Sequence, residues 1–226
     1  MTSAVAVAEG LWLGSHQPPR PRLRREPMQR IRDRSAARRA LDVALKASGF
    51  QQRLAAVSLS HTEGVGAALV GSRGRLVGVD VVRIARLRRR HADAILHPGE
   101  WRALGGHGSL SPALAWGLKE AAAKAVGAPE LYFPTRLRIV ACAAGRALVL
   151  ALGAPPLWLA GGWLRRGRFL YVWVAAVGTA GRKGGSRRGA AHTLPGGRGT
   201  HRAGARDVAV TVPAMARPWT LAWPAA

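Results

Sequence analysis

The chain has 226 residues, of which 48% are hydrophobic, so it is long and apolar enough to bury at least one sizeable core. Lysine and arginine number 35 against 11 acidic residues. The formal charge of +24 points to polyanionic partners: nucleic acid, anionic lipid, a phosphate-rich ligand or an acidic protein. The single cysteine, Cys142, excludes an internal disulfide and a cysteine-rich zinc site.

Residues 1–29 contain prolines and a dense run of arginines without apolar periodicity, which predicts a basic, flexible leader. The N-terminal residues lack the basic start of a secretory signal and include an acid, Glu9, so we expect a cytoplasmic protein. The pattern changes at residue 30, and we expect the folded domain to extend over 30–177.

An amphipathic helix is predicted from Arg30 to Gly49. Apolar residues recur there at helical spacing, Arg34 and Lys46 lie on another side, and Gly49 is placed to end the helix. The basic side is either a binding surface or a solvated charged face, and the sequence alone leaves both open.

Three short strands are predicted next, at 55–61, 66–70 and 75–82. The turn signal at 71–74 predicts that the last two form a hairpin. Side chains alternate along the third strand, so Gly78, Asp80 and Val82 share one face. A charge in such an apolar strand is costly unless a positive group meets it. Asp80 is therefore either a site residue or the partner of one of the arginines that follow it.

The best-delimited helix is predicted from Ser111 to Gly127, after a basic stretch at 83–90 and a short helix that follows Pro98. Ser111 can cap the first amides, Pro112 suits the first turn, and Gly127 supplies the stop. Both boundaries of this helix are therefore signalled.

One face of this helix combines an aromatic ring, a carboxylate and an ammonium group. Trp116, Glu120 and Lys124 fall at positions i, i+4 and i+8, while Lys119 lies one step round the helix. The pattern is that of a catalytic helix. The alternative is a surface Glu120–Lys124 pair, which is worth only about 0.3–0.5 kcal/mol.

The last predicted elements are apolar strands at 137–142, 146–150, 157–163 and 169–177. The uncharged run from Ala147 to Leu164 is long enough to span a membrane, but Pro and Gly residues interrupt it. We therefore expect strands here and no membrane partner. Beyond Gly178, Gly, Arg, Ala and Pro predominate, which predicts a disordered, low-complexity tail over 178–226. Strands, a helix and more strands predict an α+β domain.

Three segments resemble motifs of the 4′-phosphopantetheinyl transferases. They are Val-Ser-Leu-Ser-His at 57–61, Val-Gly-Val-Asp at 77–80 and Trp-Gly-Leu-Lys-Glu-Ala-Ala-Ala-Lys at 116–124. The superfamily is marked by a Gly-[Ile/Val]-Asp strand and a later Trp-x-x-Lys-Glu-Ala-x-x-Lys helix. The Ser-Leu-Ser-His element and the helix at 33–41 are similar to the Sfp-type branch, and residues 79–86 are similar to the short holo-carrier-protein synthases.

The resemblance implies transfer of 4′-phosphopantetheine from coenzyme A to a serine of an acyl or peptidyl carrier protein, with release of 3′,5′-ADP. It implies that Asp80 and Glu120 hold Mg²⁺ on the diphosphate and that Lys124 meets the phosphates. Glu120 would also orient or deprotonate the incoming serine. The residues that it implies in coenzyme A binding are Arg34, Ser60, His61, Lys119 and Lys124, with Lys119 in a supporting place.

Two features depart from the family pattern. Sfp-type enzymes usually place a second acid two residues after the aspartate, where this chain has Val82. Because Mg²⁺ needs only one or two carboxylates, we expect weaker binding rather than its loss. The short segment between the Arg34 helix and Ser58 also predicts an abridged N-terminal lobe. A monomeric pseudo-dimer or a small homo-oligomer that completes the site between subunits would accommodate this lobe.

Two other functions stay open at this point. A degenerate, inactive transferase homologue would retain the motifs without the reaction. A basic nucleic-acid-binding protein would account for the charge, but it explains neither Asp80 nor Glu120, and no binding motif or aromatic interleaving supports it. We therefore expect the acidic carrier protein and coenzyme A, rather than nucleic acid, as partners.

Overall fold

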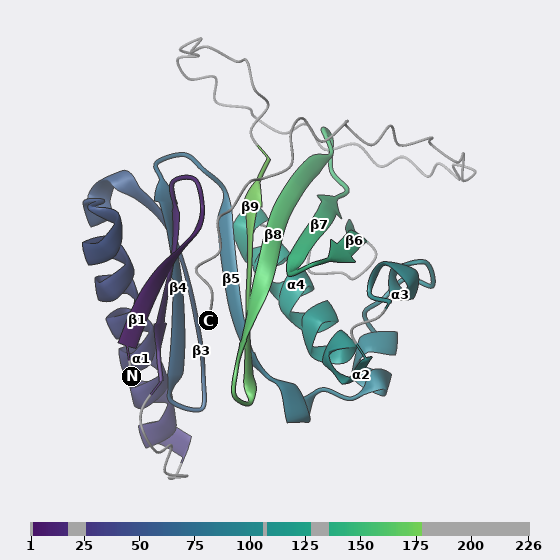
Figure 1. Ribbon diagram of the computed structural model, residues 1–226, viewed down its shortest axis with the longest axis horizontal. Helices are drawn as coiled ribbons and strands as arrows, with labels where there is room; N and C mark the ends of the chain where they lie inside the picture. The colour runs from purple at the N-terminus through teal and green to yellow at the C-terminus, as the bar shows by residue number, and fades with distance from the viewer. Residues whose placement is uncertain (1, 18–25, 106–107, 128–135, 178–226) are drawn as a thin grey trace, which may run out of the picture. The chain divides into compact units, whose positions relative to one another are not determined.

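The computed structural model describes residues 2–17, 26–105, 108–127 and 136–177 (Figure 1). The tail predicted at 178–226 lies outside the described residues, as do residues 18–25 of the predicted leader. The described elements are two antiparallel sheets, two long helices and several short ones, which confirms the predicted α+β class.

The first sheet has four strands in the order β1-β2-β4-β3. Its strands are β1 Thr2–Ala8, β2 Leu11–His16, β3 Ala55–Thr62 and β4 Val65–Ser72. Helix α1, Glu26–Ser48, packs on this sheet through small residues (Figure 1). A Cβ on Gly14 would lie 2.0 Å from the carbonyl oxygen of Ala40, so the helix backbone almost touches the sheet.

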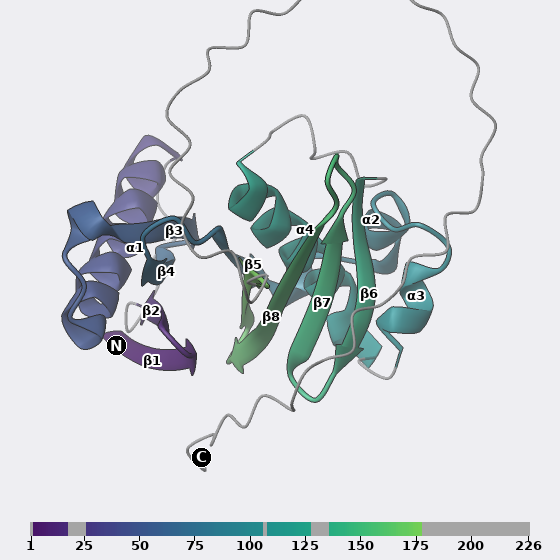
Figure 2. The ribbon, with the colours of Figure 1, turned by 90° about the horizontal axis from the view of Figure 1, so that it is seen from above.

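The second sheet has five strands in the order β5-β9-β8-β7-β6. Its strands are β5 Val77–Arg83, β6 Leu137–Ala143, β7 Arg146–Ala151, β8 Leu157–Arg166 and β9 Phe169–Ala176. Helix α4, Ser111–Val126, covers one face of this sheet (Figure 2), and the short helices α2 Arg89–Asp93 and α3 Glu100–Ala103 precede it.

Buried apolar residues fill the spaces between these layers. One cluster joins α4 to the second sheet, and another lies between the two sheets. The alternation predicted for β5 is confirmed, since Val79 and Val81 belong to the cluster between the sheets, whereas Val82 belongs to the cluster under α4. Strand β5 is therefore buried on both faces, and Asp80 lies on the face that α4 covers.

The predicted ends of the two long helices are confirmed, whereas α1 begins at Glu26, four residues before the predicted start at Arg30 and inside the predicted leader. Helix α1 ends before Gly49, which has a φ of 70°, and α4 ends before Gly127, which has a φ of 66°. The predicted cap by Ser111 is wrong, because its hydroxyl donates to the carbonyl of Leu104 instead. The start of α4 is thereby tied to the end of α3.

The predicted leader is wrong over residues 2–16, which form the hairpin of β1 and β2. Strand β2 pairs in turn with β4, and Val7, Leu11 and Leu13 are buried between the sheets. Small residues such as alanine predominate in β1, so its apolar alternation is weak in the sequence. The lobe expected to be abridged therefore contains four strands and one long helix.

The predicted hairpin of residues 66–82 is also wrong, because β4 and β5 lie in different sheets. Strand β4 is already paired on both edges, with β2 and with β3, so no edge remains for β5. Strand β5 pairs with β9 instead, and Asp80 lies opposite Val172. The turn residues at 71–74 thus lead the chain from one sheet to the other.

The apolar run from Ala147 to Leu164 forms β7 and most of β8, as predicted. Among the helices that the structure describes, none combines the length and apolar character needed to cross a lipid bilayer.

The close packing of α4 on β5 predicts the effect of one added methyl group. A Cβ on Gly78 would lie 1.8 Å from the carbonyl oxygen of Ala121, which real contacts do not allow. We expect Gly78→Ala to lower the free energy of unfolding by about 3 kcal/mol, measured by denaturant titration. Gly99→Ala is the control, because a Cβ on Gly99 meets nothing within 4 Å. Equal stabilities of the two variants would contradict this packing.

Candidate active site

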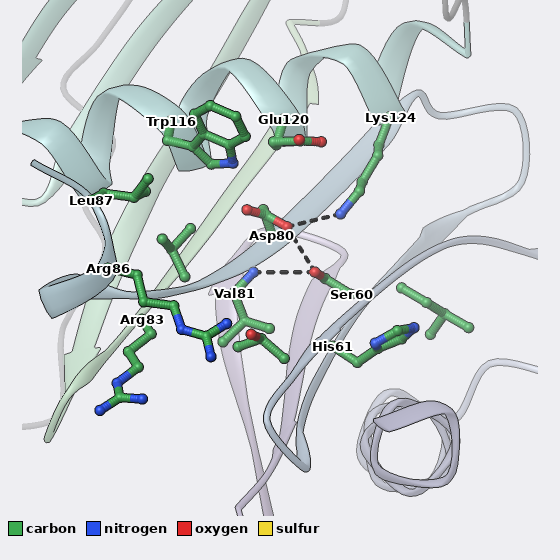
Figure 3. A pocket seen from close by; sticks show the side chains of 13 residues that line it. Ser60, His61, Asp80, Val81, Arg83, Arg86, Leu87, Trp116, Glu120 and Lys124 are labelled. Atoms are coloured by element: carbon green, nitrogen blue, oxygen red, sulfur yellow. Dashed lines mark hydrogen bonds and ion pairs between the residues drawn. The ribbon is translucent and has the colours of Figure 1, made fainter. Parts of the chain in front are cut away.

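A pocket of about 560 Å³ opens where β3, β5 and α4 meet (Figure 3). The residues predicted from the motifs that line it are Ser60, His61, Asp80, Trp116, Glu120 and Lys124. Strand β3 contributes the first two, β5 contributes Asp80, and α4 contributes the last three. Three segments that are distant in the sequence therefore place their polar side chains around one cavity.

Asp80 is the most buried acid of the pocket, with 7% of its surface exposed. Its Oδ1 accepts hydrogen bonds from Ser60 Oγ at 2.7 Å and from Lys124 Nζ at 2.9 Å. Lys124 also donates to the carbonyl of Val79 at 3.1 Å. The charge of Asp80 is thus met by Lys124 rather than by an arginine that follows it in the sequence.

Glu120 lies one helical turn before Lys124 and points into the same pocket from α4 (Figure 3). Trp116 lies one turn earlier and forms part of the wall beside Glu120. The predicted helix face therefore does face the cavity. It supplies an apolar ring, a carboxylate and an ammonium group in succession.

Lys119 is not among the residues that line the pocket, and its expected place in coenzyme A binding stays a prediction. It is 5% exposed and forms an ion pair with Glu100 at 2.8 Å. Burial lowers the pKa of Lys119, while the hydrogen bond and the charge of Glu100 act in the opposite direction. Glu100 also accepts the backbone amide of Ile139 at 2.6 Å, so this pair joins α3, α4 and β6 inside the protein.

Arg34 is exposed on α1 and is not among the residues that line the pocket. Its neighbour Asp33 contacts the site instead. The Oδ2 of Asp33 lies 3.9 Å from Nδ1 of His61, and its Oδ1 accepts the backbone amide of Gly64. Asp33 thereby connects α1 to the turn between β3 and β4, close to His61.

Two pocket residues, Arg83 and Arg86, were not singled out from the sequence. Both pair with Glu63 in the β3–β4 turn, at 3.0 Å for Arg83 and 2.8 Å for Arg86. Their position at and just beyond the end of the Asp80 strand, at the start of the basic stretch 83–90, was the available signal. The pocket therefore has a basic rim whose charge Glu63 partly neutralises.

The oxygen donors of the pocket suit a hard divalent cation. Asp80 and Glu120 are its carboxylates in the described part of the chain, and no group of three or more metal-ligating side chains occurs there. Mg²⁺ is commonly held by one or two carboxylates together with water and substrate phosphates, so this donor set fits Mg²⁺. Both donors to Asp80 contact Oδ1, and the other oxygen points away from them (Figure 3).

Residues 76–160 match the family model of the 4′-phosphopantetheinyl transferase superfamily. This confirms the resemblance for the segment from β5 into β8, which includes Asp80, Glu120 and Lys124. Ser60 and His61 precede the segment that matches the superfamily model. No curated protein sequence matched the chain.

Val82 allows a direct test of the carboxylate face. It lines the pocket on the same strand face as Asp80, yet it is only 7% exposed and packs close to Gly117. We expect Val82→Glu to tighten Mn²⁺ binding, measured by calorimetry, because a third carboxylate joins the site. The melting temperature should fall because a charge replaces a buried methyl group.

Val82→Gln is the matched control for this test, because glutamine has nearly the same shape as glutamate but carries no charge. It should lower the melting temperature but leave Mn²⁺ binding as in the wild type. Equal Mn²⁺ affinities of the Glu and Gln variants would show that residue 82 does not face the metal.

Proposed function

We propose that the protein transfers 4′-phosphopantetheine from coenzyme A to a serine of an acyl or peptidyl carrier protein in a Mg²⁺-dependent reaction. The observation that supports this most directly is the convergence of Asp80, Glu120 and Lys124 on one pocket. All three lie within the segment that matches the transferase superfamily. Coenzyme A, an apo carrier protein and a cytoplasmic location belong to the proposal.

In the proposed reaction the serine oxygen forms a bond to the phosphorus that bears the pantetheine arm. The bond from that phosphorus to the bridging oxygen breaks, and 3′,5′-ADP leaves. Glu120 accepts the proton of the serine hydroxyl, since it is the carboxylate that α4 contributes to the pocket lining.

The positive side chains of the pocket suit a diphosphate substrate. Lys124 is on α4 beside Asp80, and Arg83 and Arg86 are at the rim. Phosphoryl transfer depends chiefly on positioning and on neutralising the charge of the phosphate oxygens. Mg²⁺ bound by Asp80 and Glu120 would polarise the phosphates. Leu59, Leu87 and Trp116 supply apolar wall for the less polar part of the substrate.

The decisive test is the mass of an apo carrier protein after incubation with the purified protein, coenzyme A and Mg²⁺. We expect the mass increase of one phosphopantetheine group. Asp80→Asn and Glu120→Gln should each slow the transfer by about 100-fold or more, because the metal supplies several kcal/mol of transition-state stabilisation.

Asp42→Asn is the control, since Asp42 is an exposed acid of α1 that does not line the pocket. Its transfer rate should equal that of the wild type. Coenzyme A binding without transfer to any of a panel of apo carrier proteins would instead identify an inactive homologue and overturn the proposal. So would normal turnover in a folded Asp80→Asn variant.

A further inference from the structure

Two serine hydroxyls of β3 join the two sheets, and one of them, Ser60, lines the pocket. Strands β3 and β5 are edge strands of different sheets, and their contact is not a backbone ladder. The amide of Val79 donates to Ser58 Oγ at 3.0 Å, and the amide of Val81 donates to Ser60 Oγ at 3.3 Å. The amides of Val79 and Val81 on this edge of β5 thus bond to side chains, which avoids unpaired amides in the interior.

The two serines have the same role at this junction but differ in one contact. Ser58 and Ser60 lie two residues apart on β3 and are 8% and 6% exposed. Ser60 Oγ also donates to Asp80 Oδ1 at 2.7 Å. A hydroxyl has one proton to donate, so this contact uses the donor capacity of Ser60. Ser60 therefore cannot donate to another ligand without releasing Asp80.

Asp80 is held at one oxygen from two directions. Ser60 approaches Oδ1 from β3, and Lys124 approaches the same atom from α4 (Figure 3). Two donors on one oxygen restrict rotation of the carboxylate and determine where the second oxygen points. Groups that orient a metal ligand in this way affect metal affinity, typically by 10- to 100-fold.

We propose that Ser60 is a positioning residue that orients Asp80 for the divalent cation, in place of the direct coenzyme A contact that the family resemblance implies. This inference rests on the proposed function, because the cation in question is the one that Asp80 and Glu120 would hold on the diphosphate. The proposed role of Ser60 also makes the metal site depend on both sheets, since Ser60 belongs to the first sheet and Asp80 to the second.

The test compares Mn²⁺ binding by calorimetry for the full chain with saturating coenzyme A and no carrier protein. We expect Ser60→Ala to weaken Mn²⁺ binding by at least about tenfold. Ser58→Ala is the matched control, because it removes the equivalent contact to a β5 amide without touching Asp80. It should change Mn²⁺ affinity less than about twofold. It should lower the melting temperature by about as much as Ser60→Ala does.

A second variant keeps the test informative if Ser60→Ala fails to fold. Ser60→Cys keeps a similar volume but has only a weak donor, so it should also weaken Mn²⁺ binding. Coenzyme A binding in the presence of a chelator is measured for the same variants and should be unchanged. This readout separates a positioning role from a direct contact.

The outcomes distinguish this inference from the proposed function. Equal Mn²⁺ affinities of the Ser58 and Ser60 variants would overturn the positioning role while leaving the metal site intact. Weaker coenzyme A binding in chelator, with unchanged Mn²⁺ affinity, would show that Ser60 contacts the substrate directly. Absence of Mn²⁺ binding in the wild type would overturn the metal site itself and the inference with it.

Discussion

The buried charge of Asp80 is the constraint on which the arrangement of the site depends. A carboxylate with 7% exposure inside a packed strand is costly unless partners compensate it. Lys124 and Ser60 provide that compensation from two different elements, so α4 and β3 must both lie close to β5. The pocket lies where these three elements meet. The partners that stabilise the charge of Asp80 therefore also bring the polar side chains of the pocket together.

Glycines make this approach possible. Gly78 of β5 faces the backbone of α4 with no room for a side chain, and Gly117 of α4 lies against Val172 and Val82. The helix can therefore come near enough for Lys124 to reach both Asp80 and the carbonyl of Val79. On the far side of α4, the Lys119–Glu100 pair joins the helix to β6 through buried charges. The rotation of α4 is thus determined from both sides.

Local patterns predicted the parts of the site that lie within single elements. Strand alternation placed Asp80 on the face of Gly78 and Val82, and helical spacing placed Glu120 and Lys124 together. Each inference needs only the geometry of one strand or one helix. The family motifs predicted in addition that the Asp80 strand and the Glu120 helix form one site. The match of residues 76–160 to the superfamily model includes both elements.

Contacts between elements could not be predicted in the same way. Lys119 is adjacent to Glu120, and nothing in the helix pattern shows that Glu100 meets it in the interior. The turn signal before β5 was correct as a turn, but the partner of β5 depends on β4 having both edges occupied. The role of Asp33 at His61 likewise depends on how α1 crosses the first sheet.

We propose that Asp80 and Glu120 form one cation site in the pocket between β3, β5 and α4, and that this pocket binds coenzyme A. The most direct test of this proposal is the anomalous scattering of Mn²⁺ in crystals grown with coenzyme A. The account predicts one Mn²⁺ peak within ligand distance of oxygens of Asp80, Glu120 and the diphosphate. A diphosphate bound elsewhere, or a peak that neither carboxylate contacts, would contradict it.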